Sequence, residues 1–397
     1  MLKYLSINKI MIEKVSKKTK SFKGIKENPS ILGFGCMRLP RLNPEKPDID
    51  IKQAEEMIDY AYKHGVNYFD TAYPYHEGLS ELFIGEALKK YPRDSFYLAN
   101  KMPGWEIKTV EDAKRIFNEQ LKKCQVDYFD FYLCHALGKK NFEIYQKPEI
   151  VHFLQKMKKE GKIKHLGFSF HDTPEVLDEI IHTYPWDFVQ LQLNYLDWDF
   201  QNAKKQYKIV ESYGVPIIVM EPVRGGTLAH LSEDAASILK EAKPESSLAS
   251  WAIRYAASKD QVMTVLSGMS NLEQTIDNVE TLTDFKPLTT DEQKTIDDAL
   301  KVFLENNTIP CTNCKYCMPC DHGVDIPTVF KAYNKYKISK FGRAFINEYE
   351  SLGKEKLAAN CVSCGECLPK CPQGINIPER MQEIEQVYQE LKQRYNQ

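Results

Sequence analysis

The feature that most constrains the fold of this chain is a regular alternation of short apolar segments with longer amphipathic ones, beginning near residue 30. The apolar segments are rich in aromatic and β-branched residues, which is typical of strands that are buried on both faces of a parallel sheet. Eight such strands are predicted, at residues 31–36, 66–72, 95–101, 128–135, 164–171, 187–194, 215–222 and 262–269.

The stretches between these segments have the periodicity of amphipathic helices. Within residues 51–65, one helical face is predicted to carry Ile51, Ala54, Met57, Ile58 and Ala61. Thr109 is a predicted N-cap of a later helix. Eight β–α units over about 250 residues predict an α/β fold of the TIM (β/α)8 barrel type. The rival fold, an open doubly wound sheet, would favour an early glycine-rich dinucleotide turn, and this sequence does not contain one.

Ionisable side chains follow the predicted strands at their C-terminal ends, where a TIM barrel places its active site. Asp70 and Tyr75 follow the second strand, Lys101 ends the third and His135 ends the fourth. A nearby lysine ammonium is expected to lower the pKa of the tyrosine, aspartate can hold the lysine, and histidine can orient a carbonyl oxygen. These side chains therefore predict proton transfer to an oxygen, with hydride supplied by a cofactor because no side chain can supply it.

The sequence resembles the aldo-keto reductase family over roughly residues 30–285. The resemblance is carried by "GFGCMRLP", "FDTAYPYHEGLSELFIGEAL", "LANKM", "DYFDFYLCHAL", "GKIKHLGFSFHD", "FVQLQLNYLD", "GVPIIVMEPVRGG" and "SGMSNLEQTIDNVE". It implies a barrel that binds a nicotinamide cofactor without a Rossmann fold, with Asp70, Tyr75, Lys101 and His135 as a catalytic tetrad. It also implies cofactor contacts, to the nicotinamide end from Ser169, Gln190 and Met220 and to the adenine-ribose end from Gly268, Gln274 and Asn278.

Three positions depart from the family's pattern. Phe170 stands where many members have asparagine, and Met220 where they often have a tyrosine under the nicotinamide. Gln274 stands where an arginine often meets the 2′-phosphate of the cofactor. Because an arginine–phosphate pair is bidentate and strong, its absence leaves NADP(H) and NAD(H) both open, with Arg224 as a candidate substitute.

The last ninety residues carry eight of the chain's eleven cysteines, in two groups. The groups are Cys311, Cys314, Cys317 and Cys320, and then Cys361, Cys364, Cys367 and Cys371. The second spacing resembles the bacterial ferredoxin run, in which the fourth cysteine binds the other cluster. "CDHGVDIP" is also similar to "CPQGINIP", which indicates a pair of related sites. We therefore expect one [4Fe–4S] cluster on Cys311, Cys314, Cys317 and Cys371, and a second on Cys320, Cys361, Cys364 and Cys367.

Zinc is the alternative, since structural zinc also takes four cysteines, usually from two C-x2-C pairs. One cluster rather than two also stays open, because Asp321 stands where the second group has a proline after its last cysteine. The helical link between the groups resembles α-helical two-cluster ferredoxin domains. The predicted domains are a basic N-terminal arm at 1–29, a barrel at 30–288, a helical connector at 289–307 and an iron–sulfur domain at 308–397.

These observations predict an oxidoreductase that passes hydride between a nicotinamide cofactor and an aldehyde or ketone. Its clusters would carry electrons for a protein partner, sense redox state or brace the fold. The alternative is a nucleotide-binding electron-transfer or redox-sensing module without carbonyl turnover. A formal net charge of −2 gives no reason to expect nucleic acid, and the absence of a long apolar run predicts no membrane span. Without a signal peptide we expect a cytoplasmic protein whose cysteines stay reduced.

Overall fold

The computed structural model describes residues 14–17, 21–22, 24–43, 46–146, 148–306 and 308–395. The chain divides into two compact units, Met1–Pro222 with Ile253–Leu288, and Val223–Ala252 with Thr289–Gln397. The predicted barrel of residues 30–288 is therefore interrupted in this division by Val223–Ala252.

The first unit is a closed barrel of parallel strands in the order in which they occur along the chain, with β1 paired to β8. The strands are β1 (Leu32–Gly35), β2 (Tyr68–Asp70), β3 (Tyr97–Met102), β4 (Phe129–Leu137), β5 (Ile163–Phe170), β6 (Phe188–Gln192), β7 (Ile217–Met220) and β8 (Val262–Ser267). This confirms the predicted TIM-type barrel. Most of the strands are shorter than predicted, because only the central residues of each apolar segment pair with both neighbouring strands.

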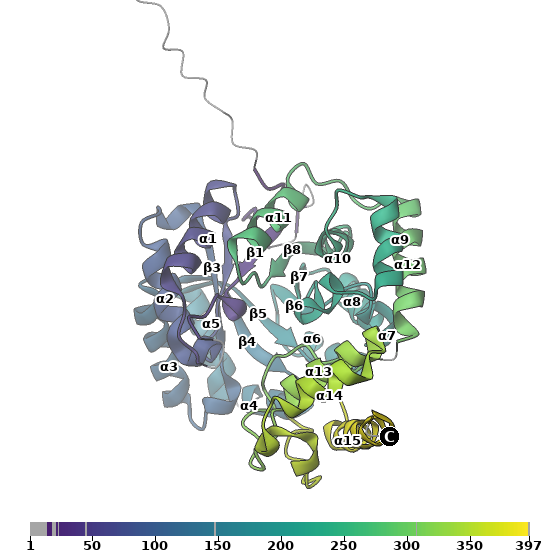
Figure 1. Cartoon of the computed structure of the whole chain (residues 1–397). Coiled ribbons are helices and arrows are strands. Elements are labelled where there is room, and N and C mark those ends of the chain that lie inside the picture. Colours follow the sequence, from purple (N-terminus) through teal and green to yellow (C-terminus); the bar gives the residue numbers. More distant parts are fainter. Residues whose placement is uncertain are drawn as a thin grey trace, which may run out of the picture. The chain divides into compact units, whose positions relative to one another are not determined.

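Helices connect successive strands and surround the barrel (Figure 1). They are α1 (Ile51–Lys63), α2 (Leu79–Leu88), α3 (Val110–Cys124), α4 (Lys139–Tyr145), α5 (Pro148–Lys159), α6 (Pro174–Thr183), α7 (Asp197–Phe200), α8 (Ala203–Tyr213), α10 (Leu248–Ala257) and α11 (Leu272–Leu282). Four of the five residues predicted on the apolar face of α1 are buried, namely Ala54, Met57, Ile58 and Ala61. Ile51, the first residue of the helix, is 50% exposed, so that part of the prediction is wrong. Thr109 caps α3 by accepting a hydrogen bond from the backbone of Asp112, whose carboxylate accepts one from the Thr109 backbone in return.

The segment that precedes β1 packs against the N-terminal end of the barrel. Phe22 and Ile25 are buried against the first residues of several strands, including Tyr68 and Phe188. Sequence analysis predicts a basic arm over residues 1–29, of which 1–13, 18–20 and 23 lie outside the described residues. Within the described part, apolar side chains between the lysines are buried because the N-terminal end of the barrel presents an apolar surface to them.

The second unit is helical. Its helices are α9 (Glu233–Ala242), α12 (Thr290–Leu304), α13 (Ile326–Ser339), α14 (Gly342–Glu350) and α15 (Ile377–Tyr395). α12 occupies most of the predicted helical connector and begins with a capping box between Thr289 and Glu292. α13, α14 and α15 share a core that contains Phe330, Tyr349 and Ile384. Among the described residues of the whole chain, no helix is both long enough and apolar enough to cross a membrane.

The two similar sequences in the cysteine groups have similar structures. Gly323 and Gly374 both have a positive φ, at 80° and 61°, so each turn uses a backbone conformation that favours glycine. Each turn then leads into the first residue of a helix, Ile326 of α13 and Ile377 of α15. The internal repeat that is visible in the sequence thus corresponds to a repeated turn–helix unit.

Candidate active site and cysteine-lined cavities

Three of the four predicted catalytic side chains are in direct contact at the C-terminal ends of β2 and β3. The Lys101 ammonium donates hydrogen bonds to Asp70 Oδ1 at 2.5 Å, to the Thr71 carbonyl at 2.8 Å and to the Tyr75 hydroxyl at 3.3 Å. Asp70, Tyr75 and Lys101 are all buried. The charge on the lysine is therefore balanced by the aspartate, and the phenol lies within reach of the ammonium.

Tyr75 owes its place to an unusual turn. It begins the short 3-10 segment η2 (Tyr75–Gly78), in which His76, Glu77 and Gly78 have φ values of 51°, 54° and 89°. Two of these residues carry a Cβ, so the left-handed backbone is costly there and must be held by the surrounding structure. The turn directs the chain from β2 into α2 and leaves the tyrosine buried beside Lys101.

The pKa of Tyr75 is shifted in the direction opposite to the expectation. Burial raises the pKa of Tyr75 well above its usual value, the nearby carboxylates of Asp70 and Glu221 raise it further, and Arg38 opposes them. Sequence analysis expected the lysine to lower this pKa, and that direction is wrong for this structure. Desolvation outweighs the ammonium because the lysine's charge is already balanced by Asp70. The hydroxyl is therefore protonated and can act as an acid.

His135 faces the same site from β4. Its ring meets the Tyr75 ring edge-on at 6.2 Å between centroids, and Trp105 lies 5.0 Å from it on another side. The register of β4 against β5 shifts between Cys134 and Leu137, and a bulge of this kind can redirect a side chain. Burial lowers the pKa of His135 well below 6.5, with Lys101 and His171 adding to the effect, so the imidazole is neutral.

The predicted nicotinamide contacts lie on neighbouring strands. Ser169 of β5 is paired in register with Gln190 of β6, and the Ser169 hydroxyl accepts a hydrogen bond from the Ala136 backbone at 2.8 Å. Gln190 Oε1 is buried without a hydrogen-bond partner among the described residues. A buried acceptor of this kind fits an amide N–H donor, which is what a carboxamide presents. Met220 ends β7.

The predicted contacts to the other end of the cofactor come from β8 and α11. Asn278 donates to the Ser267 hydroxyl at 2.7 Å, directly before Gly268. Gln274 is exposed in the first turn of α11, and its Oε1 accepts a hydrogen bond from the Ser270 backbone at 2.8 Å. Arg224, the candidate substitute for a phosphate-binding arginine, is 1% exposed and belongs to the second unit.

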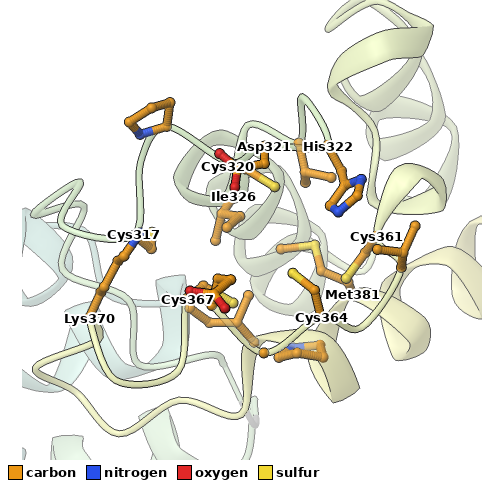
Figure 2. A pocket seen from close by; sticks show the side chains of 17 residues that line it. Cys317, Cys320, Asp321, His322, Ile326, Cys361, Cys364, Cys367, Lys370 and Met381 are labelled. Atoms are coloured by element: carbon orange, nitrogen blue, oxygen red, sulfur yellow. The ribbon is translucent and has the colours of Figure 1, made fainter.

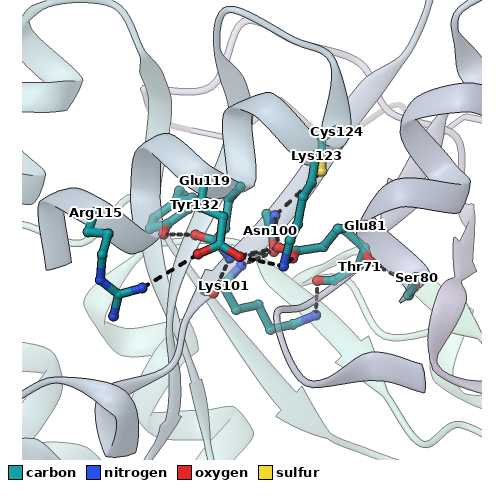
Figure 3. A network of polar contacts seen from close by, with 11 residues as sticks. Thr71, Ser80, Glu81, Asn100, Lys101, Arg115, Glu119, Lys123, Cys124 and Tyr132 are labelled. Carbon is teal, nitrogen blue, oxygen red and sulfur yellow. Dashed lines mark hydrogen bonds and ion pairs between the residues drawn. The ribbon is translucent and has the colours of Figure 1, made fainter. Parts of the chain in front are cut away.

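A buried polar network behind Lys101 was not predicted (Figure 3). It is centred on Glu81 of α2, which accepts hydrogen bonds from Asn100 and Gln120. Gln120 also donates to the Lys101 carbonyl at 2.9 Å. Glu81 lies within the matched stretch "FDTAYPYHEGLSELFIGEAL", where a carboxylate on the otherwise apolar face of a helix was the available signal.

A partly buried ion pair between Arg38 and Glu221, at 3.2 Å, was also missed. Arg38 ends η1 (Cys36–Arg38) after β1, and Glu221 follows β7, so the pair joins the segments that follow these two strands. Their separation of 183 positions left no local signal in the sequence.

In the second unit, the eight clustered cysteines surround two cavities. One cavity is lined by Cys311, Cys314, Cys317 and Cys371. The other is lined by Cys320, Cys361, Cys364 and Cys367, with Cys317 on its edge (Figure 2). Each cavity is thus lined by cysteines of both sequence groups, and Cys317 lines both cavities. The exchange of fourth cysteines between two clusters stays a prediction.

The donors in these cavities fit iron–sulfur clusters. All the clustered cysteines are free of disulfides, and thiolates are the usual ligands of [4Fe–4S] clusters. Among the described residues, no group of three or more His, Cys, Asp or Glu side chains is placed to hold a single metal ion. At least four cysteines line each cavity, and four thiolates are the ligands that a [4Fe–4S] cluster takes.

Comparison with known proteins finds a separate family match for each of two parts of the chain. Residues 31–301 match the model of the aldo/keto reductase family, and residues 310–375 match a 4Fe-4S dicluster domain. The chain is 26% identical over 287 residues to L-galactose dehydrogenase of Arabidopsis thaliana, a match that covers 66% of this chain and 88% of that protein. It is 27% identical over 198 residues to the NADH-specific methylglyoxal reductase of Escherichia coli, covering 46% of this chain and 60% of that protein.

Among solved structures, the barrel is similar to aldo-keto reductase AKR11C1 from Bacillus halodurans in its holo form. The identity is 27%, the TM-score is 0.59, and the alignment covers 72% of this chain and 96% of that one. The part left uncovered is a large share of the chain, so the likeness concerns the barrel.

Proposed function

Because the chain belongs to the aldo/keto reductase family, we propose that it reduces a small aldehyde or ketone and that Tyr75 provides the proton. The chain is an NAD(P)H-dependent oxidoreductase by family, and its 4Fe-4S domain adds iron–sulfur chemistry. The observation that carries the proposal is the buried contact of the Tyr75 hydroxyl with the Lys101 ammonium, which is itself paired to Asp70.

Each member of the proposed tetrad has a task that follows from its surroundings. Tyr75 keeps its proton at neutral pH because burial raises its pKa, and it can release that proton to a carbonyl oxygen that is becoming negative. Lys101 stabilises the phenolate that is left, and Asp70 holds the lysine in place. His135, being neutral, has one N–H with which to orient the carbonyl oxygen. A bound reduced nicotinamide would supply the hydride.

The residues of the proposed cofactor site fit a nicotinamide nucleotide. They do not by themselves distinguish NADPH, which carries a 2′-phosphate, from NADH. Ser169 and the unpartnered Gln190 Oε1 would hold the carboxamide, Met220 would lie under the ring, and Gly268 and Asn278 would contact the adenine-ribose end. Gln274 would contact the same end, but a neutral amide does not favour a 2′-phosphate over a hydroxyl. We propose on this ground that NADH is used at least as well as NADPH.

The proposal places two [4Fe–4S] clusters in the tail, each with the cysteines that line one cavity. It assigns them to single-electron exchange with a protein partner, because hydride transfer moves two electrons together whereas a cluster moves one. Cys364, which is exposed, would bring the second cluster near the surface. A reducing, cytoplasmic setting suits the absence of disulfides among the cysteines.

The reaction is tested with anaerobically purified protein that retains its iron. We expect oxidation of NADH or NADPH in the presence of at least one small carbonyl from a panel of 2-oxoaldehydes, short aldehydes, ketones and aldose sugars, since the named relatives act on an oxoaldehyde and a sugar. Absorbance at 340 nm follows the reaction. If the protein binds the nucleotide but turns over no carbonyl in the panel, the second candidate function, an electron-transfer or redox-sensing module, is favoured instead.

Replacing Gln274 by arginine tests the assignment of the adenine-ribose end. We expect the Kd for NADPH to fall roughly ten- to hundredfold, because a charged hydrogen-bonded pair forms with the 2′-phosphate, while the Kd for NADH stays within about twofold. Quenching of intrinsic fluorescence measures both constants. Asn118→Arg, at an exposed position of α3 in the same unit, adds the same charge on a different helix and is the control. Equal effects of the two substitutions would contradict the assignment.

A further inference from the structure

Glu81 is a carboxylate in a place where charge is costly. Its side chain is 0% exposed, in the first turn of α2. Burial raises the pKa of Glu81, and hydrogen bonds from Asn100 and Gln120 and the nearby Lys123 oppose this. A charge that is buried inside the protein needs such partners, since a neutral apolar side chain would fill the same space with a smaller loss of solvation free energy.

The partners of Glu81 hold the backbone of Lys101. Asn100 Nδ2 and Gln120 Nε2 donate to Glu81 Oε1 at 2.9 and 3.0 Å. Asn100 Oδ1 accepts from the Lys101 N–H at 2.8 Å, and Gln120 Nε2 donates to the Lys101 carbonyl at 2.9 Å. Tyr132 fixes the other end of the Gln120 amide by donating to its Oε1 at 2.5 Å. The carboxylate thus orients two amides, which in turn bind both polar groups of the Lys101 backbone (Figure 3).

Ser80, which precedes Glu81 in α2, helps to hold the ammonium end of Lys101. The Ser80 hydroxyl is 2.9 Å from the Thr71 hydroxyl, and the Thr71 carbonyl accepts a hydrogen bond from the Lys101 ammonium at 2.8 Å. Ser80 and Glu81 follow directly on the turn that carries Tyr75. One short segment therefore determines where the phenol lies and where both ends of the lysine lie.

We propose that Glu81 is a positioning residue for carbonyl reduction, acting through Asn100 and Gln120 to hold Lys101 beside the Tyr75 hydroxyl. The inference rests on the proposed function of that tetrad. A carboxylate is required because two amide N–H groups point at one of its oxygens and the Lys123 ammonium lies 3.5 Å from the other. Glutamine has the same shape, but one of its two oxygens is replaced by an NH2 group. That group would face either the two amides or the Lys123 ammonium, which are all hydrogen-bond donors.

The test compares Glu81→Gln with Glu86→Gln, an exposed glutamate on the same helix that pairs with Lys89 and Gln125. We expect Glu81→Gln to lower kcat by about ten- to a hundredfold, because small displacements of a reacting group have effects of this size. The KM for the carbonyl and the Kd for the nucleotide should stay within about twofold. Glu86→Gln should match the wild type in all three constants, and Glu81→Asp should recover part of kcat because it restores the charge.

A double-mutant cycle separates positioning from general loss of structure. In a Lys101→Met background, Glu81→Gln should lower the residual turnover no further, since its effect passes through the lysine. A full additional loss in that background, or a kcat for Glu81→Gln within twofold of the wild type, would overturn the inference. If Glu81→Gln does not fold, Gln120→Met removes the bond to the Lys101 carbonyl and should give the same split between kcat and KM. If the proposed function itself is wrong, the wild-type protein will show no carbonyl turnover, which distinguishes that failure from a failure of the inference about Glu81.

Discussion

Tyr75→Phe is expected to lower kcat for carbonyl reduction by about 10²–10⁴-fold, the usual contribution of a positioned general acid. The substitution removes only the hydroxyl that lies 3.3 Å from the Lys101 ammonium, so the ring should stay packed against His135. Because burial keeps this hydroxyl protonated, its loss removes the proton that the carbonyl oxygen needs. Steady-state turnover with the best carbonyl of the panel measures the effect, and fluorescence titration should show an unchanged Kd for the nucleotide.

Tyr73→Phe is the matched control for this prediction. Tyr73 lies two positions earlier in the same loop and contacts the Lys123 ammonium through its ring, which phenylalanine retains. We expect its kcat to stay within about twofold of the wild type. Carbonyl reduction that survives Tyr75→Phe unchanged would show that the proton comes from another group, and the tetrad assignment would then fail.

Removal of cysteines from one cavity should halve the iron content of the protein. Two [4Fe–4S] clusters predict about eight iron atoms per chain after anaerobic reconstitution, with the broad absorbance of such clusters near 400 nm. Cys311→Ala with Cys314→Ala should leave about four, and so should Cys361→Ala with Cys364→Ala. Cys134→Ala, which removes a buried thiol of β4, should leave the count unchanged.

The sharper part of this prediction concerns the exchanged cysteines. Cys371→Ala should disturb the same electron paramagnetic resonance signal as the Cys311 and Cys314 pair, although Cys371 belongs to the other sequence group. Cys320→Ala should disturb the signal of the Cys361 and Cys364 pair. A colourless protein with stoichiometric zinc would contradict the clusters. Signals that follow the sequence groups instead of the cavities would contradict only the exchange.

Most of the fold could be read from the chain, because period and spacing are local properties. The eight apolar segments, their amphipathic partners and the Thr109 cap all depend on residues within a few positions of one another, and each was predicted and then found. The interruption of the barrel unit by Val223–Ala252 was not predicted. Helix α9 in that stretch packs against α12, more than forty positions away, and no pattern within either helix identifies the other as its partner.

The candidate active site shows the same contrast between features set by local sequence and features set by long-range contacts. Asp70, Tyr75 and Lys101 were predicted together because each follows or ends a strand, and parallel strands in a barrel end at the same rim. The direction of the Tyr75 pKa was predicted wrongly, because it depends on how much water the folded chain removes from the hydroxyl. Glu81 looked like an ordinary helix residue until Asn100 and Gln120, from β3 and α3, were found around it.

The sequence by itself therefore determined which chemical groups are present, on which elements they lie and which end of the barrel they share. The repeated cysteine spacing also indicated that the two groups exchange their fourth members. Only the tertiary structure decided the protonation of Tyr75, the partners of Glu81 and the grouping of the thiols around two cavities. The physical reason is that desolvation and buried hydrogen bonds depend on atoms brought together from distant parts of the chain, whereas strand and helix patterns are set by near neighbours.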